Sequence, residues 1–394
     1  EDREGGGLLP DDTAFPEELR TRRVDAGVAG RWLVEGGPLL NVRASGMAQR
    51  HDHAFGPRRE RDRHATWFGE ASAAWTVLRH TVVIGAAVQQ ESYRARDVAG
   101  FDYTFTIPSL FAQDDWAPAE WLGVTASARA DRHSEYGTFV SPRVSALLRP
   151  AEGWSIRASA GGGYFAPTPF TEETEAIGLA ELGALGGLEA ERAVGASLDV
   201  GRVMGDLELH ASVFASEVEN ALQLIALDDV APAVVLANAP GPVRTWGTEA
   251  LVRFHRGPWH ATATHTWTRA REPEPGFGTR REVPLTPRHQ AGIVGMWEAE
   301  GGRIGMELYY TGRQSLDDNP YRAESRPYLV AGLLAERRFG RVRVFVNAEN
   351  LADARVTRWH PLPLPARSPE LRWTTDAWAP LDGRVINAGV RLEL

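Results

Sequence analysis

The feature that most constrains this chain is an alternation of apolar and polar residues that recurs in segments of about 10 to 14 residues. Within residues 154–164, for example, Trp154 and Ile156 alternate with Ser155 and Arg157. A period of two places the apolar and polar sets on opposite faces of a β-strand. Strands of soluble proteins average roughly 5–6 residues, so longer strands with one apolar face are typical of transmembrane β-barrels.

The connections between these segments alternate between two lengths. Turns rich in Gly and Pro are predicted on one side, because these residues allow tight reversals, and longer connections are predicted on the other. In outer-membrane barrels the short turns face the periplasm and the long loops face the outside. Further alternating segments are 66–77, 122–131, 207–215, 341–349 and 386–394; the short turns are near 35–38, 78–79, 117–120, 150–152, 202–205, 256–258, 298–302 and 339–341; the long connections are near 52–63, 165–190, 271–284, 313–326 and 355–383.

The alternating segments correspond to about 17 strands, and the first and last both run toward the periplasm. Bacterial single-chain barrels usually have an even number of strands, and an unpaired strand edge is costly in lipid. Either the count is off by one or strands precede Glu1. Residues 1–7 are neither a signal peptide nor a methionine start, which favours the second interpretation.

Tryptophan is concentrated beside the predicted short turns, where seven of the 13 Trp residues lie. A Trp ring combines an apolar body with a polar N–H and therefore prefers a bilayer interface. We predict a periplasmic aromatic girdle from these seven and a second girdle at the opposite end. A soluble β-sandwich is the alternative, but strands of this length disfavour it. The periplasmic set is Trp32, Trp75, Trp116, Trp121, Trp154, Trp259 and Trp297; the opposite set is Tyr93, Tyr103, Tyr136, Tyr164, Trp267, Tyr309 and Tyr328.

The composition excludes several other classes of protein. No run of about 20 apolar residues is present, so a helical membrane protein is excluded. The chain has no Cys, which rules out disulfides and thiolate metal sites. Its formal net charge of −9 argues against a nucleic-acid partner.

A few polar clusters could bind ions, but a solvated loop is the simpler interpretation of each. His51, Asp52, His53 and His64 have side chains suited to a metal, and they fall near the predicted 52–63 loop. Asp317, Asp318 and Asn319 could similarly bind calcium. We predict no metal, no cofactor and no catalytic residue. Charged residues predicted to face the interior and to pair with one another are Arg129, Arg143, Arg157, Arg253 and Arg343 with Glu70, Glu208, Glu249 and Glu349.

Several local motifs over residues 100–394 resemble the C-terminal barrel of TonB-dependent outer-membrane receptors. Residues 164–173 resemble the segment in which a strand leaves the membrane for a long loop, and residues 188–195 resemble the return to the next strand, with Ala190 in place of the usual Pro. The terminal Leu394 departs from the aromatic end common in outer-membrane proteins. The residues that carry the resemblance are Phe165, Ala166, Pro167, Thr168, Glu172, Glu191, Asn238, Gly247, Glu249, Thr286, Pro287, His289, Asn347, Asn350, Asp353, Gly383 and Arg384.

The resemblance implies an all-β transmembrane antiparallel barrel in which residues 1–394 supply about 16–17 of 22 strands and no plug domain. It implies an outer-membrane receptor, not an enzyme, that takes up a scarce siderophore-, cobalamin- or glycan-like solute. Extracellular loops would bind this small-molecule ligand, lipid would surround the barrel, and the TonB complex would act through a plug absent here. The alternative is a passive porin-like channel, which would conduct ions freely where a gated importer would be nearly closed.

Overall fold

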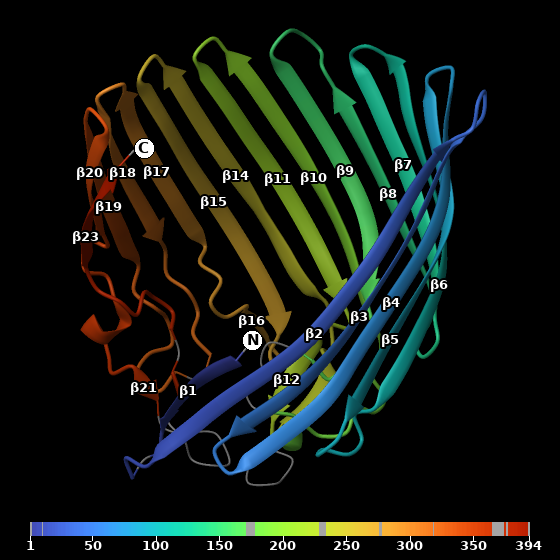
Figure 1. Ribbon diagram of the computed structural model, residues 1–394, viewed down its shortest axis with the longest axis horizontal. Helices are drawn as coiled ribbons and strands as arrows, with labels where there is room; N and C mark the ends of the chain where they lie inside the picture. Colours follow the sequence, from blue (N-terminus) through green and yellow to red (C-terminus); the bar gives the residue numbers. More distant parts are fainter. Residues whose placement is uncertain are drawn as a thin grey trace.

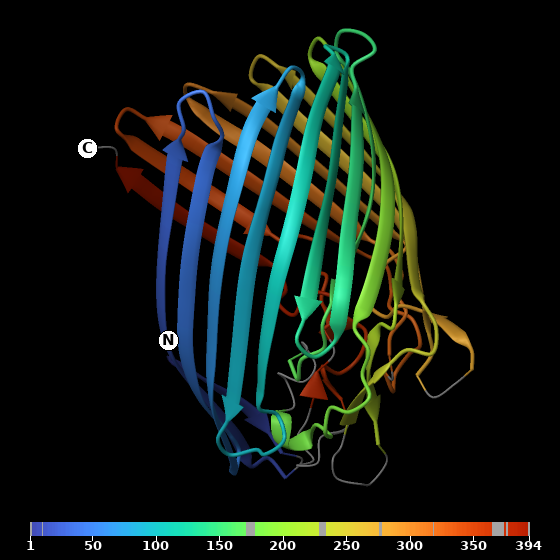
Figure 2. The same cartoon turned by 90° about the vertical axis from the view of Figure 1, so that its right-hand side faces the viewer.

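The computed structural model describes residues 2–9, 11–170, 178–227, 234–275, 278–317, 319–364, 374–375 and 377–392. Nearly all regular structure in these residues belongs to one antiparallel sheet of 19 strands. The sheet curls, so that the N-terminal strands face the C-terminal strands across the interior (Figure 1 and Figure 2). Within the described residues, no helix is long and apolar enough to cross a membrane.

Seventeen long strands form the wall as a meander in which each pairs with the next, which confirms the predicted all-β barrel fold and strand count. In the described residues no pairing joins the last strand, β23, to β1 or β2. The long strands are β2 (Ala14–Leu33), β3 (Leu39–Phe55), β4 (Arg58–Val77), β5 (His80–Ala95), β6 (Tyr103–Ala119), β7 (Leu122–His133), β8 (Gly137–Leu148), β9 (Trp154–Phe165), β10 (Glu191–Met204), β11 (Leu207–Glu219), β14 (Val243–Arg256), β15 (Trp259–Pro273), β17 (His289–Ala299), β18 (Gly302–Thr311), β19 (Tyr328–Phe339), β20 (Val342–Glu349) and β23 (Val385–Leu392).

Shorter elements cluster away from the tight turns. β1 (Asp2–Leu8) pairs with the start of β2, and β16 (Arg280–Glu282) pairs with the end of β15. The remaining elements are the hairpins β12 (Leu222–Ala226) with β13 (Val234–Asn238) and β21 (Pro363–Leu364) with β22 (Thr374–Thr375), and the 3₁₀ helices η1 (Leu179–Glu181) and η2 (Val356–Arg358).

The two ends of the wall differ as the sequence predicts. All eight predicted short turns lie at one end, which is uppermost in Figure 1 and Figure 2 and is called the tight-turn end below. Several are two-residue hairpin turns whose first residue has a positive φ, such as Gly205 at 57° and Gly257 at 56°. The other end, the long-loop end, carries the long connections of residues 166–190, 220–242, 274–288, 312–327 and 350–384.

The long loop predicted near residues 52–63 is wrong. β3 continues to Phe55 and β4 starts at Arg58, so only Gly56 and Pro57 separate the two strands. Charged residues alternate across both strands, and a charged strand that projects beyond an apolar belt remains fully paired with its neighbours. The charged residues of this segment therefore lie in strands and do not mark a loop. The turn between β3 and β4 is set by Gly56, whose φ is 53°.

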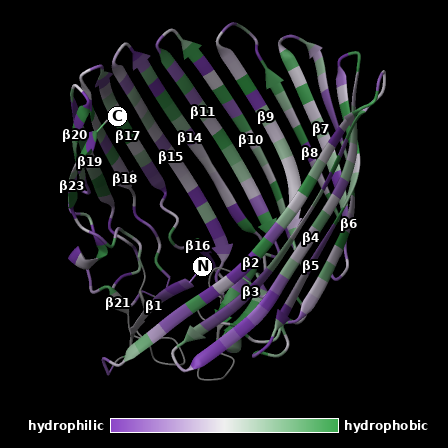
Figure 3. Cartoon of the chain, in the orientation of Figure 1, coloured by the Kyte–Doolittle hydropathy of each residue, from purple (hydrophilic) through white to green (hydrophobic). Residues whose placement is uncertain are grey.

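Hydrophilic and hydrophobic residues are interspersed along the strands of the wall (Figure 3), and strand alternation sorts them onto two faces of different chemistry. The outer face exposes apolar side chains along strand after strand; Val24 is 72% exposed and Val390 is 70% exposed. The inner face carries ion pairs such as Arg43 Nη2 to Glu70 Oε2 at 2.9 Å. Near the tight-turn end, the buried Glu336 pairs with Arg303 and Arg343 at 3.3 and 3.1 Å.

The interior pairing prediction is correct in part. Arg253 and Glu208 pair at 3.6 Å, as predicted. Arg129 instead pairs with Asp131 on its own strand at 2.8 Å.

The predicted second girdle is wrong for four of its tyrosines. Strand register puts Tyr309 and Tyr328 on the face of β18 and β19 that carries the inward Glu336. Tyr93 and Tyr103 lie on the inner face, where Tyr93 is 2% exposed and packs against Phe101. The strand pattern could not reveal this, because a buried cluster formed with loop residues has no periodicity of its own. A second buried cluster at the long-loop end includes Tyr328, which packs against Trp378 and Val356.

Candidate functional site

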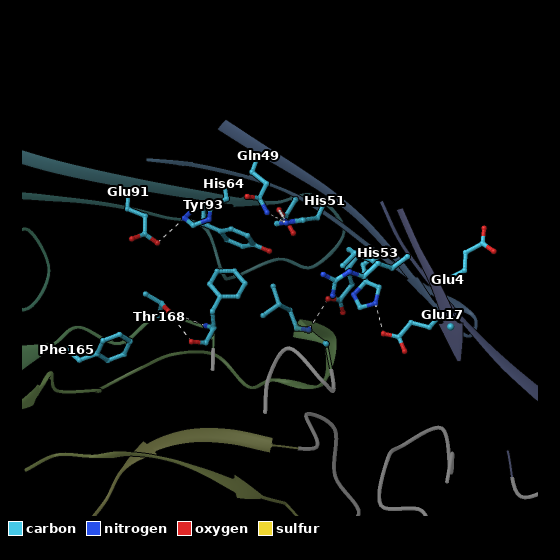
Figure 4. A pocket seen from close by; sticks show the side chains of 18 residues that line it. Glu4, Glu17, Gln49, His51, His53, His64, Glu91, Tyr93, Phe165 and Thr168 are labelled. Atoms are coloured by element: carbon cyan, nitrogen blue, oxygen red, sulfur yellow. Dashed lines mark hydrogen bonds and ion pairs between the residues drawn. The ribbon is translucent and has the colours of Figure 1, made fainter. Parts of the chain in front are cut away.

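A cavity of about 800 Å³ opens on the inner wall at the long-loop end. The inner faces of β2 to β5 and residues of β1 line one side, and residues of the β9–β10 connection line the other (Figure 4). The connection reaches the cavity with Thr168, Phe170 and Leu179.

Three imidazoles project into this cavity, each bonded to a carboxylate. His51 on β3 lies directly opposite Asp62 on β4, and its Nδ1 is 2.9 Å from Asp62 Oδ1. His53 Nε2 is 3.0 Å from Glu17 Oε1 on β2. The strand alternation puts His51, His53 and Glu17 on one face, which explains why residues from separate strands meet.

The third pair continues the series on the next strands. His64 Nε2 on β4 is 3.0 Å from Glu91 Oε1 on β5, and the same oxygen accepts a hydrogen bond from the Tyr103 hydroxyl at 2.6 Å. Tyr93, whose ring centroid lies 4.7 Å from that of Phe170 in an edge-on contact, closes this side of the cavity. The site therefore combines a polar floor with an aromatic wall.

Glu60 holds the loop side of the cavity in place. Its two carboxylate oxygens accept hydrogen bonds from the backbone N–H groups of Leu179 and Ala180, each at 2.9 Å. Beside it, Arg58 pairs with the buried Glu181. These contacts connect β4 to a loop more than 100 residues away in sequence, and they fix the position of η1 over the cavity.

The lining is negatively charged. Five carboxylates and one guanidinium, that of Arg3, give a net charge of −4 when the three imidazoles are neutral. Such a surface accepts hydrogen bonds and attracts cations. Among the described residues, no group of three or more His, Asp or Glu side chains is placed to hold a metal ion. The carboxylates are Glu4, Glu17, Glu60, Asp62 and Glu91.

The sequence singled out the histidines of this site but missed its carboxylates. Glu17 and Glu91 belong to strands outside the His-rich segment, so only cross-strand register brings them to the imidazoles. Extending the alternation through residues 49–64 would have placed His51, His53 and His64 on the inner face. The calcium candidate gains no support, since Asp317 pairs with Arg281 at 2.8 Å and Asp318 lies outside the described residues.

Four motif residues meet at the base of the last long connection. The buried Asn350 donates from Nδ2 to the Asp382 carbonyl at 3.0 Å, and Asp353 Oδ1 accepts from the Arg384 N–H at 3.3 Å. A Cβ at Gly383 would overlap Asp353 Oδ1, so a larger residue there would displace this carboxylate. Motifs separated by 30 residues in sequence thus fasten the two ends of one loop.

A second group fastens the connections around β10 and β13. Glu191 accepts a hydrogen bond from the Leu222 N–H at 2.6 Å. Asn238 accepts from the Glu189 N–H at 2.8 Å and donates to the Asn220 carbonyl at 2.7 Å.

The first motif borders the cavity. Phe165 and Thr168 line it, while Pro167 is fully buried and accepts a hydrogen bond from the Tyr136 hydroxyl at 3.1 Å. Ala166 is half-buried between them. Glu172 lies outside the described residues.

The remaining motif residues lie away from the cavity. A Cβ at Gly247 would overlap the Trp267 carbonyl oxygen, which requires glycine on β14, and Glu249 is exposed on the same strand. His289 Nδ1 is 3.2 Å from His265 Nε2. Thr286 donates to the Pro284 carbonyl at 3.2 Å, Pro287 is half-buried and Asn347 donates to Glu349 at 2.6 Å.

The seven tryptophans predicted as a girdle all lie in or beside strand ends at the tight-turn end. Trp259 is 58% exposed and Trp32 is 56% exposed. The others are Trp75, Trp116, Trp121, Trp154 and Trp297, each exposed or half-buried.

Comparison with known proteins identifies similar barrels. The family model described as TonB dependent receptor-like, beta-barrel, matches residues 19–351. No curated protein matches the chain in sequence.

Among solved structures, a single-residue mutant of the ferric enterobactin receptor PfeA from Pseudomonas aeruginosa has a TM-score of 0.69 at 14% identity, over 96% of this chain and 62% of that one. The FrpB iron transporter from Neisseria meningitidis has a TM-score of 0.73 at 13% identity, over 99% and 67% respectively. The copper transporter OprC has a TM-score of 0.70 at 15% identity, over 96% and 66%. At these identities the likeness shows the fold, and the chain spans about two thirds of the length of these structures.

Proposed function

The chain belongs to the TonB-dependent receptor-like β-barrel family, and on that premise we propose that it is the barrel of an outer-membrane importer for a scarce solute. Proteins of this family are outer-membrane receptors and transporters rather than enzymes. The observation that carries the proposal is the cavity of about 800 Å³ beneath the long loops. Its polar floor and aromatic wall are the features of a small-molecule site.

The charge of the lining narrows the solute class. A net charge of −4 opposes a polyanionic ligand and favours a cationic or hydroxyl-rich one. Of the siderophore-, cobalamin- and glycan-like solutes, those that expose hydroxyl or amino donors fit best. Carboxylates such as Glu17 and Glu91 would accept those hydrogen bonds.

The proposal assigns the two ends of the barrel to two compartments. The long-loop end faces the outside and captures the solute, and the tight-turn end faces the periplasm, with the seven tryptophans as its interfacial girdle. Work from the TonB complex would act through a plug domain, which residues 1–394 do not supply in this proposal.

Uptake by cells that express the natural full-length protein tests the proposal. The probes are an ⁵⁵Fe-loaded siderophore, ⁵⁷Co-cyanocobalamin and a ¹⁴C-labelled oligosaccharide, each with and without a protonophore. We expect one probe to accumulate against its gradient and the protonophore to abolish this. Equilibration that a protonophore does not change would instead identify the passive channel and overturn the importer.

A cavity variant separates binding from passage. Glu17→Gln with Asp62→Asn should weaken uptake of the transported probe, because two of the five carboxylates lose their charge. Glu120→Gln with Glu152→Gln also removes two carboxylates, from exposed tight turns at the opposite end, and should leave uptake unaltered. Equal uptake by both variants would show that the cavity is not the solute-binding site.

A further inference from the structure

Four arginines lie side by side across four neighbouring strands. Arg22 on β2 is directly opposite Arg50 on β3, Arg50 is opposite Arg63 on β4, and Arg63 is opposite Arg94 on β5. Adjacent strands are about 4.8 Å apart, so this arginine ladder spans about 14 Å. Like charges placed directly opposite one another destabilise a sheet. An anion bound across the ladder would relieve that repulsion.

The arginine ladder lies on the outer face. The alternation that turns His51 and His64 inward turns Arg50 and Arg63 outward, and all four ladder arginines are exposed. On β2 the same face carries Val24 and Val28, which are 72% and 71% exposed.

The ladder also lies at the upper edge of the apolar belt. On β2 about ten residues separate Arg22 from Trp32 at the tight-turn end, which is the length of a transmembrane strand. In the next row toward the tight turns, Val24, Ala48 and Ala65 are paired across the same strands. The positive row therefore borders an apolar surface directly.

Three members of the ladder have no partner in the described part of the chain. Arg22, Arg50 and Arg63 make no side-chain hydrogen bond or ion pair there. Arg94 differs, because it donates to the Tyr103 carbonyl at 2.6 Å and to Thr104 at 2.9 Å.

The nearby carboxylates are already engaged by other arginines. Asp52 accepts from Arg59 Nε at 2.6 Å, and Asp97 accepts from Arg61 Nε at 2.9 Å. Glu18 pairs with Arg20. Within the ladder only Arg94 has a carboxylate partner in the described residues, Asp102 at 3.9 Å, so Arg22, Arg50 and Arg63 are not neutralised by their surroundings.

The wider arginine patch is basic in a chain whose formal net charge is −9. It has eight arginines and four carboxylates and so carries a net charge of +4. A groove of about 290 Å³ runs through it. Five arginines and two carboxylates line the groove together with His51: Arg20, Arg22, Arg50, Arg61 and Arg96 with Asp52 and Asp62. The patch consists of Arg20, Arg22, Arg50, Arg59, Arg61, Arg63, Arg94 and Arg96 with Glu18, Asp52, Asp97 and Asp102.

We propose that the arginine patch binds a lipid that carries two phosphate groups. A guanidinium matches a phosphate with paired hydrogen bonds, and two phosphates could each be held by two rungs of the ladder. The adjoining Val24 and Ala48 surface receives the acyl chains, which an acidic protein or a free anion would not cover. This inference rests on the outer-membrane placement proposed above and adds a specific lipid partner to it.

Equilibrium titration of the detergent-solubilised chain, read by native mass spectrometry, tests the proposal. The probes are diphosphoryl lipid A, monophosphoryl lipid A, inorganic phosphate and a poly-glutamate peptide. We expect diphosphoryl lipid A to bind most tightly and monophosphoryl lipid A more weakly. Equal competition by inorganic phosphate would indicate a small-anion site, and tighter binding of poly-glutamate would indicate an acidic protein; either result overturns the lipid assignment.

Charge-removing variants connect the binding to the ladder. Arg50→Gln with Arg63→Gln should weaken diphosphoryl lipid A binding about tenfold, because two charge-assisted contacts are lost. Arg149→Gln with Arg341→Gln removes the same charge from exposed tight-turn positions and should bind as the parent does. Equal affinities for the two double variants would overturn the proposal.

A second variant keeps the test decisive if folding is affected. Arg50→Lys with Arg63→Lys retains the charge but loses the planar fork and should fall between the parent and the glutamine variant. Heat-modifiable mobility on gels verifies that each variant is folded. Solute uptake is not part of this assay, so its outcome and that of the importer proposal are independent.

Discussion

The inner and outer faces of the same four strands, β2 to β5, have opposite chemistry at the long-loop end. The inner face contributes His51, His64 and Glu91 to a cavity whose lining has a net charge of −4. The outer face carries the arginine patch with a net charge of +4. Only the thickness of one sheet separates the two.

This contrast shows that side chains continue to alternate between the two faces of a strand even where the apolar–polar pattern of the sequence has ended. In residues 49–64 both faces are charged, so hydropathy alternation disappears while side-chain alternation persists. Charge type is only a partial signal of the face. The outward residues Arg50 and Arg63 are basic and the inward Glu60 and Asp62 are acidic, but Asp52 also points outward.

Inserting one residue into β3 should have the largest effect on the difference between the two faces. One Ala between Ala48 and Gln49 would shift the end of β3 by one position and move His51 outward and Arg50 inward. Both the cavity and the arginine ladder would then be lost, and we expect most of the protein to be unfolded or to lose lipid binding. Heat-modifiable gel mobility and lipid titration measure this.

The control is the same insertion between Gly56 and Pro57, where the turn lengthens without a change of register. That variant should retain its fold and bind lipid as the parent does. Equal behaviour of the two insertions would show that the faces are not set by register.

The barrel itself was predictable because its strands repeat one physical rule. The short turns followed from Gly and Pro positions such as Gly205 and Gly257, where a positive φ is needed. The strand count followed from hydropathy alternation. Both features are local in sequence and need no knowledge of distant contacts.

The site was less predictable because distant residues build it. Leu179 reaches Glu60 only through the folded loop, and Tyr93 is buried by Phe170, which the sequence places far away. Glu17 meets His53 through strand register. No periodicity marks such contacts, which is why Tyr93 was predicted to face lipid.

Removing the Glu60 carboxylate tests how the loop is held over the cavity on the inner face. Glu60→Ala leaves the N–H groups of Leu179 and Ala180 without their acceptor and should destabilise the loop by about 1–3 kcal/mol. Faster amide hydrogen exchange at residues 178–185 measures this. Glu60→Gln keeps an acceptor and should show a smaller change; identical exchange in Glu60→Ala and the parent would contradict the role given to Glu60.

Reversing the charge of Arg63 tests the arginine ladder on the outer face. Arg63→Glu places a carboxylate between Arg50 and Arg94 and should stabilise lipid-free protein by about 0.2–1 kcal/mol, because repulsion across the ladder becomes attraction. The same change should weaken diphosphoryl lipid A binding. Unfolding in detergent and lipid titration would therefore move in opposite directions, whereas Arg149→Glu should alter neither.

The smallest effect concerns the loop that borders the arginine patch. Side-chain hydrogen bonds from Arg61 lower the pKa of Asp97 to about 2. An unfolded aspartate has a pKa of about 3.9, so ionised Asp97 stabilises the fold above that pH, and the contribution is lost as the pH falls toward 2. Asp97→Asn should cost less than about 1 kcal/mol at pH 7, because the pair is solvent-screened. In an Arg61→Gln background the pH dependence of the Asp97→Asn difference should become smaller, because the backbone N–H of residue 61, 2.7 Å from Asp97 Oδ2, still lowers the pKa of the carboxyl. An unchanged pH dependence in urea unfolding between pH 2 and 7 would show that the Arg61 side chain does not hold Asp97.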